Sequence, residues 1–318
     1  MFDCNSTTLN RPNFRSRQFL RSTTSVLAVS TLIAMAGLYP VSSARAQNVE
    51  WVGPGSTVGV GSSGTWDNTG PNQNNWIPLG GAGGAPGFTT GDNVTFNTGT
   101  YTVNVVEAFT VGNMVFNGNA TLANSGGSLS FGSSGSTLSV AAGTTVSIAV
   151  DFVNSATVNV VGDGDLSFGG SITTVAGGGL FNDATGTVVV TGAVSSDGYV
   201  RNRGAGTLEL GDVTAATLIE NTGAGTLTLN GTTASTGVNI AGSTGLPVGI
   251  RNTGTGALNF NGTTTNTISN LSSGTVVVSG SAGDVSNTSS STGTIDISSQ
   301  VANVSNLGSA NVSSINLD

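Results

Sequence analysis

The chain has no lysine and no histidine, and Cys4 is its only cysteine. A serine or cysteine nucleophile activated by histidine therefore cannot be assembled, and neither can a Schiff base on lysine. A single cysteine also excludes an internal disulfide and a zinc site built on thiolates. Carboxylates are the remaining candidates for general acid and base catalysis. We therefore expect no enzyme, and no cofactor or metal site.

Positive charge is scarce as well. Only 8 of the 318 residues are basic, against 16 acidic residues, and five of the basic ones lie within positions 1–46. The rest of the chain keeps three arginines against 15 acids, a net charge of −12. Such a surface repels nucleic acids and anionic lipids. We therefore expect no nucleic-acid partner.

The first 46 residues have the pattern of an export signal. Four arginines between positions 11 and 21 precede an apolar run at 26–38, and the small-residue site Ala44-Arg45-Ala46 follows. We predict that residues 1–46 are a signal peptide and that the mature chain begins at Gln47. The apolar run is too short and too interrupted to span a bilayer as a helix.

One asparagine recurs along the second half of the chain, each time before glycine or serine and then alternating apolar residues. The steps between its copies are 20, 19, 31, 18, 17 and 19 residues. A period near 20 built on short apolar segments indicates a solenoid of stacked coils. The seven copies are Asn182, Asn202, Asn221, Asn252, Asn270, Asn287 and Asn306.

Apolar and hydroxyl residues alternate throughout this region, as at 145–148, 187–190 and 226–229. A period of two predicts strands with one face inward, and the Gly, Asn and Asp between them predict turns. The frequent, patterned β-branched residues argue against disorder. We predict an all-β parallel β-helix, a β-solenoid, with coils of about 20 residues. Residues 111–318 form its repeat domain.

Residues 47–110 differ from the repeats, because they hold all three tryptophans, Trp51, Trp66 and Trp76. A solenoid needs an atypical terminal unit to cover its open end. Aromatic side chains bury the largest areas and suit that purpose. We predict that residues 47–110 form a Trp-rich N-terminal capping region.

Equivalent residues of stacked coils lie about 4.8 Å apart, so the recurring asparagines are expected to form a buried structural ladder. Each of its hydrogen bonds would contribute on the order of 1 kcal/mol. The alternative is the ordinary turn preference of asparagine, which does not explain seven copies in phase. Thr233 is expected to be exposed and to tolerate replacement by alanine.

Charged residues directly precede three of the asparagines. They are Arg201, Glu220 and Arg251. In neighbouring coils they would form an ion ladder on the surface that contributes little by itself; a ligand-binding charge cluster is the alternative. The long step before Asn252 contains an insertion at 237–248, either an enlarged coil or a projecting binding segment.

Asp163 and Asp165 are two residues apart in a glycine-rich turn and could share a face. A catalytic carboxylate pair and a calcium loop are both possible for such a pair. The motif occurs once rather than as a tandem array, which favours a plain turn.

The start of the mature chain resembles the passenger regions of bacterial autotransporters. The resemblance is carried by Trp51, Gly-Thr-Trp-Asp-Asn at 64–68, Asn-Trp at 75–76, Gly-Asp-Asn-Val-Thr-Phe at 91–96 and Val-Gly-Asn-Met-Val-Phe-Asn at 111–117. It implies a right-handed parallel β-helix displayed at, or released from, the outer surface of a Gram-negative bacterium. Such passengers include adhesins, toxins and proteases, and the missing histidine excludes the protease type.

The family's C-terminal membrane barrel, with its aromatic girdles, is not expected here, because Phe260 is the last aromatic residue. We therefore expect no self-insertion into a membrane. The expected function is structural or adhesive, with glycans or proteins of host or neighbouring cell surfaces as partners. The alternatives are a carbohydrate-active β-helix enzyme, which needs carboxylates clustered in one groove, and a truncated, nonfunctional passenger fragment.

Overall fold

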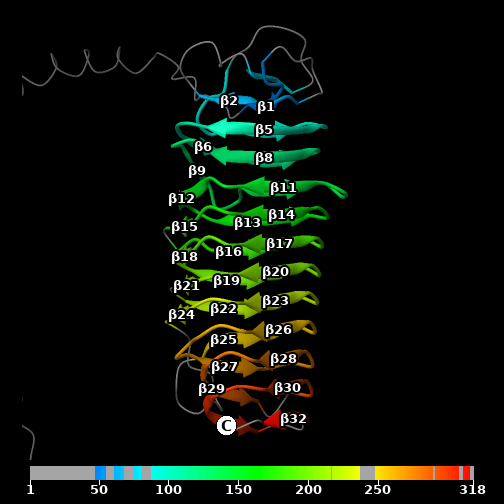
Figure 1. Ribbon diagram of the computed structural model, residues 1–318, viewed down its shortest axis with the longest axis vertical. Helices are drawn as coiled ribbons and strands as arrows, with labels where there is room; N and C mark the ends of the chain where they lie inside the picture. Colours follow the sequence, from blue (N-terminus) through cyan, green and yellow to red (C-terminus); the bar gives the residue numbers. More distant parts are fainter. Residues whose placement is uncertain are drawn as a thin grey trace, which may run out of the picture. The chain divides into compact units, whose positions relative to one another are not determined.

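The computed structural model describes residues 47–54, 61–67, 75–79, 87–175, 177–215, 217–236, 248–288, 291–307 and 311–315. The predicted signal peptide and most of the insertion lie outside the described residues. No described residue lies in a helix long and apolar enough to cross a membrane. The unit that begins at Ala46 is a stack of β-coils (Figure 1).

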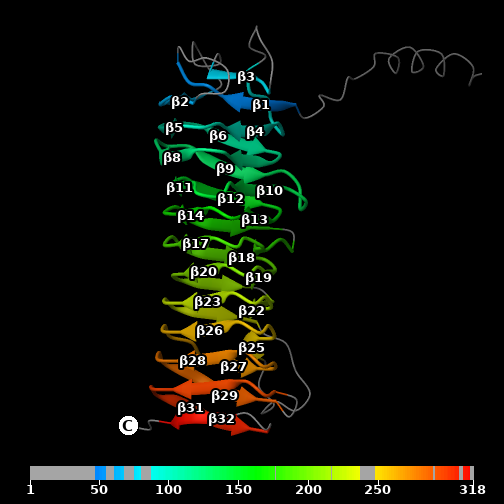
Figure 2. The same ribbon diagram turned by 90° about the vertical axis from the view of Figure 1, so that its right-hand side faces the viewer.

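Each coil of the stack contributes strands to as many as three sheets, which the two views show side by side along the same axis (Figures 1 and 2). The first sheet has 13 strands, in the spatial order β3 (Trp76–Pro78), β1 (Asn48–Trp51), β4 (Asn93–Phe96), β7 (Met114–Phe116), β10 (Thr137–Val140), β13 (Val158–Gly162), β16 (Leu180–Asn182), β19 (Tyr199–Asn202), β22 (Leu218–Asn221), β25 (Val248–Asn252), β27 (Thr267–Asn270), β29 (Ala282–Asn287) and β31 (Val301–Asn306).

The second sheet has 12 strands, in the order β2 (Gly64–Trp66), β5 (Thr100–Val105), β8 (Asn119–Asn124), β11 (Thr145–Ile148), β14 (Asp165–Phe168), β17 (Thr187–Val190), β20 (Thr207–Leu210), β23 (Thr226–Leu229), β26 (Ala257–Phe260), β28 (Thr275–Val278), β30 (Thr294–Ile297) and β32 (Asn311–Ile315). The third sheet has 7 strands, in the order β6 (Ala108–Val111), β9 (Ser128–Phe131), β12 (Asp151–Ser155), β15 (Ile172–Thr174), β18 (Val194–Ser196), β21 (Val213–Ala215) and β24 (Thr233–Ser235).

Parallel pairing between successive coils confirms the predicted β-solenoid. In the second sheet, for example, Leu208 of β20 lies in register with Val188 before it and Leu227 after it. All three are fully buried, while the outward Thr207 and Glu209 are not. The sequence alternation produces this arrangement, because successive side chains of a strand point to opposite faces. Burying each Val or Leu contributes about 1.5–3 kcal/mol.

Aromatic side chains fill the N-terminal end of the interior, as expected from the three tryptophans in this part of the sequence. Trp51, Trp66 and Trp76 are fully buried, and Trp66 stacks on Phe109 with a centroid distance of 4.6 Å. The predicted boundary at residue 111 is not a break in the sheets. Strands β4 and β5 already pair in parallel with β7 and β8, so the regular stack begins upstream of it.

Asn221 and Asn252 remain register partners across the long step before Asn252, and the additional residues fall between β24 and β25 in the sequence. The pairing of β25 with β27 has a register irregularity between Val248 and Ile250. The third sheet ends at β24 and continues only as isolated bridges that join Thr263 to Thr232 and to Ser281. The later coils are correspondingly shorter, at 17–19 residues between asparagines.

Candidate functional site

Five of the recurring asparagines form a continuous ladder along the first sheet. Side-chain Nδ2 donates to Oδ1 of the next coil at 2.8 Å from Asn182 to Asn202, and at 3.1 Å from Asn202 to Asn221. The same bond measures 3.1 Å from Asn221 to Asn252 and 3.5 Å from Asn252 to Asn270. All five side chains are fully buried. Hydrogen bonding between coils, and not turn preference alone, therefore explains why asparagine recurs at the same position of successive coils.

The ladder is interrupted at the next coil. Asn270 and Asn287 are register partners, yet the buried Oδ1 of Asn287 has no hydrogen-bond partner. Asn287 instead donates to Asn306 at 3.0 Å, and Asn306 is exposed. The seven asparagines thus form two hydrogen-bonded groups, of five and of two residues.

Four of the five ladder asparagines, all but Asn182, also donate to the carbonyl of the glycine four residues later. Nδ2 of Asn221 donates to the carbonyl of Gly225 and to the carbonyl of Ala257 in the next coil, both at 3.1 Å. Its Oδ1 accepts from Asn202. One amide therefore joins its own turn to two neighbouring coils.

We expect Asn221→Leu to lower the free energy of unfolding by about 1–3 kcal/mol, because it leaves buried polar groups such as Oδ1 of Asn252 without a partner. Urea unfolding of the purified chain measures this. Thr233 is an unsuitable control, because it is 2% exposed and the sequence expectation of an exposed residue was wrong. Thr214, which is exposed, replaces it. Equal midpoints for Asn221→Leu and Thr214→Ala would contradict the structural role of the ladder.

The three charged residues before the asparagines lie side by side in the first sheet. Nε of Arg201 contacts Oε2 of Glu220 at 2.5 Å, and Nε of Arg251 bonds the other carboxylate oxygen. Arg201 also lies over the ring of Tyr199, 3.7 Å from its centroid. The side chain of Glu220 is only 2% exposed. The predicted ion pairs of Glu220 with the two arginines are present. The prediction that this ladder lies on the surface was wrong for the carboxylate of Glu220, which is buried.

Two further contacts between coils were missed from the sequence. Arg203 forms a bidentate ion pair with Asp183. On the second sheet, an exposed chain of hydrogen bonds runs through successive coils in the order Glu209, Asn230, Asn261 and Ser279. The sequence feature that could have indicated this chain of hydrogen bonds is the asparagine that directly follows each of the strands β23 and β26.

Asp163 lies in a turn and Asp165 is the first residue of β14, and both bond to the next coil. Asp163 accepts from the Thr185 hydroxyl at 2.5 Å, and Asp165 accepts from the backbone N–H of Thr187 at 2.9 Å. Both aspartates are exposed. Within the described part of the chain, no three acidic or cysteine side chains are grouped so that they could hold a metal ion.

Other acidic side chains also bond to neighbouring coils or to the cap. Eleven acidic side chains hydrogen-bond to a residue 19 to 47 positions away, which places the partner in an adjoining coil or cap segment. They are Glu50, Asp92, Asp151, Asp163, Asp165, Asp183, Asp197, Glu209, Asp212, Glu220 and Asp284.

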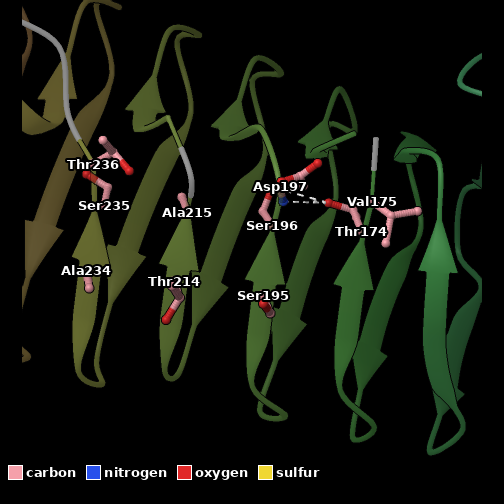
Figure 3. A pocket seen from close by; sticks show the side chains of 10 residues that line it. All are labelled: Thr174, Val175, Ser195, Ser196, Asp197, Thr214, Ala215, Ala234, Ser235 and Thr236. Atoms are coloured by element: carbon pink, nitrogen blue, oxygen red, sulfur yellow. Dashed lines mark hydrogen bonds between the residues drawn. The ribbon is translucent and has the colours of Figure 1, made fainter. Parts of the chain in front are cut away.

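A hollow lies over the outer side of the third sheet and is shown in Figure 3. Its volume is about 540 Å³, and its lining includes Ser195, Thr214 and Ala234, which occupy equivalent positions of β18, β21 and β24. At its rim Asp197 accepts from the N–H of Gly177 at 2.7 Å. A second hollow of about 420 Å³ lies over β6, β9 and β12. Val175 lines both hollows, and the two together are here called the third-sheet groove.

No protein-family model, curated protein or solved structure matches this chain. The fold defines its class as a β-solenoid, and the contacts between coils and the third-sheet groove are the features from which a function can be argued.

Proposed function

We propose that the chain is exported and acts as a surface-displayed or released β-solenoid with a structural, adhesive role at the bacterial cell surface. The leader at 1–46 and the resemblance to autotransporter passengers support export to the outer surface. In this proposal glycans or proteins of other cells are the partners, and no reaction is catalysed.

The observation that carries the proposal is the use of the carboxylates. In a carbohydrate-active enzyme two of them must converge on one bond, with a proton donor among them. In this chain eleven carboxylates hydrogen-bond to residues of adjoining coils or cap segments. Asp163 and Asp165 do not converge, because they bond separately to Thr185 and Thr187. Arg201 and Arg251 are both bound to Glu220, and Arg203 is bound to Asp183. The polar groups of this chain thus support the stack.

The test begins with the full chain expressed in a Gram-negative host, with antibody labelling of intact cells and of the culture medium. Labelled cells, or cells coated with the released protein, should adhere to other cells more than cells without it. The purified protein should release no reducing ends and no unsaturated products from pectins, glucans or exopolysaccharides.

Two results would contradict the proposal. One is retention of the whole protein inside the cell with the leader uncleaved. The other is turnover of a polysaccharide that is abolished by Asp163→Asn or Asp165→Asn, with Asp183→Asn as the matched control. The second result would establish the carbohydrate-active enzyme instead.

A further inference from the structure

We propose that the third-sheet groove is the adhesive surface and that it binds an extended, uncharged glycan chain lying along the axis of the stack. This inference rests on the proposed adhesive function and assigns its binding site and ligand class.

The third-sheet groove is elongated. The two hollows that meet at Val175 follow the third sheet, whose seven strands extend over roughly 30 Å at the spacing of parallel strands. A linear polymer matches a groove of this form better than a compact ligand does. Val175 itself is 37% exposed, so a partly apolar contact is available where the hollows join.

The floor of the groove is rich in hydroxyl groups. Thr110 and Ser130 line the second hollow, and their hydroxyls bond to each other at 2.9 Å. Ser195 and Thr214 line the first hollow, and Ala234 continues their row (Figure 3). The inner hydroxyls are already engaged, since Thr174 donates to the carbonyl of Gly178 at 2.8 Å. Ser195 and Thr214 are exposed and have no hydrogen-bond partner within the described residues. A hydroxyl both donates and accepts, so such a row suits a ligand that is itself polyhydroxylic.

The groove has little charge. Asp197 is the one charged residue among those that line the two hollows, and one of its oxygens already accepts from Gly177. The basic side chains Arg201, Arg203 and Arg251 are paired with Glu220 or Asp183 on or beside the first sheet. An anionic polymer would find no free cation in the groove and would meet a chain of net negative charge.

An extended peptide fits the groove less well. Peptides that add to a sheet bond to the free backbone groups of an edge strand. Between its end strands β6 and β24, the floor consists of strands that are paired on both sides, such as β18 between β15 and β21. Binding along the length of the floor must therefore use side chains, and short hydroxyl side chains provide no pockets for the alternate side chains of a peptide.

The experiment is affinity electrophoresis of the full exported chain in native gels. The gels contain either a soluble neutral polysaccharide, namely dextran, galactomannan, xyloglucan or hydroxyethyl cellulose, or the anionic alginate. We expect at least one neutral polymer, and not alginate, to retard the protein. Thr214→Arg, which fills the groove, should weaken that association at least tenfold. The matched control Thr228→Arg, outward-facing on β23 of the second sheet, should leave it unchanged.

Retardation by alginate alone, by none of the polymers, or equally in both arginine variants would overturn the inference. Melting curves of both variants establish that they are folded. Cell adhesion is measured in parallel and separates the two proposals. If Thr214→Arg cells adhere as well as the parent cells, the groove is not the adhesive surface, while the adhesive function itself stands. If the parent cells do not adhere, the proposed function fails whatever the gels show.

Discussion

Gly225→Ala is expected to lower the free energy of unfolding by about 3 kcal/mol or more, because a side chain at this position has no space. A Cβ on Gly225 would lie 1.9 Å from the carbonyl oxygen of Gly206 in the preceding coil. That oxygen belongs to the backbone and cannot move without separating the two coils. The loss should appear as a lower urea midpoint and a lower melting temperature.

The close approach recurs in six successive coils. The residue corresponding to Gly225 is glycine in each of them, with a Cβ-to-carbonyl approach of 1.9 to 2.2 Å: Gly186, Gly206, Gly225, Gly256, Gly274 and Gly293. The recurring Asn-x-Gly-x-Gly pattern of the sequence therefore has two physical causes. The asparagine bonds to the next coil, and the second glycine allows the turns to stack.

Gly135→Ala is the matched control for Gly225→Ala. A Cβ on Gly135 would meet no atom within 4 Å, and this residue is exposed. We expect its unfolding midpoint to equal that of the parent chain. If Gly225→Ala were as stable as Gly135→Ala, the close stacking of the turns would be refuted.

The repeat could be predicted from the sequence because period and alternation are local properties. Alternation decides which side chains face inward, so the strands at 187–190 and 226–229 were predictable. It does not decide whether an outward side chain is covered in the folded stack. Glu220 lies on an outward position yet is buried. Thr233 is buried for a different reason, because it lies in register with the inward-facing Val213. Both were expected to be exposed.

The third sheet and its groove were not predictable for a related reason. Ser195 and Thr214 have the same alternating pattern as outward residues of the second sheet, such as Thr207 and Thr228. What distinguishes them is the hollow over β15, β18 and β21, whose lining includes Val175 and Asp197 from the segments that follow β15 and β18. The path of the chain between strands decides which outward residues line a hollow, and residue alternation contains no information about that path.

Glu220→Gln is expected to have the second large effect, about 2–4 kcal/mol of lost stability. The substitution keeps the shape of the side chain and removes the only negative charge between Arg201 and Arg251. Removing one partner of a fully buried pair costs about 3–5 kcal/mol, since an uncompensated charge remains. The two arginine side chains are 26% and 22% exposed, so water relieves part of that penalty.

The pair of Asp183 with Arg203 provides the comparison for Glu220→Gln. Its side chains are 39% and 35% exposed, and exposed pairs contribute about 0–1 kcal/mol. Asp183→Asn should therefore change the urea midpoint little, and raising the salt concentration should abolish what difference there is. The effect of Glu220→Gln should persist at high salt, because the carboxylate is shielded from solvent ions. If the two variants lost the same small amount of stability, the Glu220 ladder would be a surface contact after all, as the sequence alone suggested.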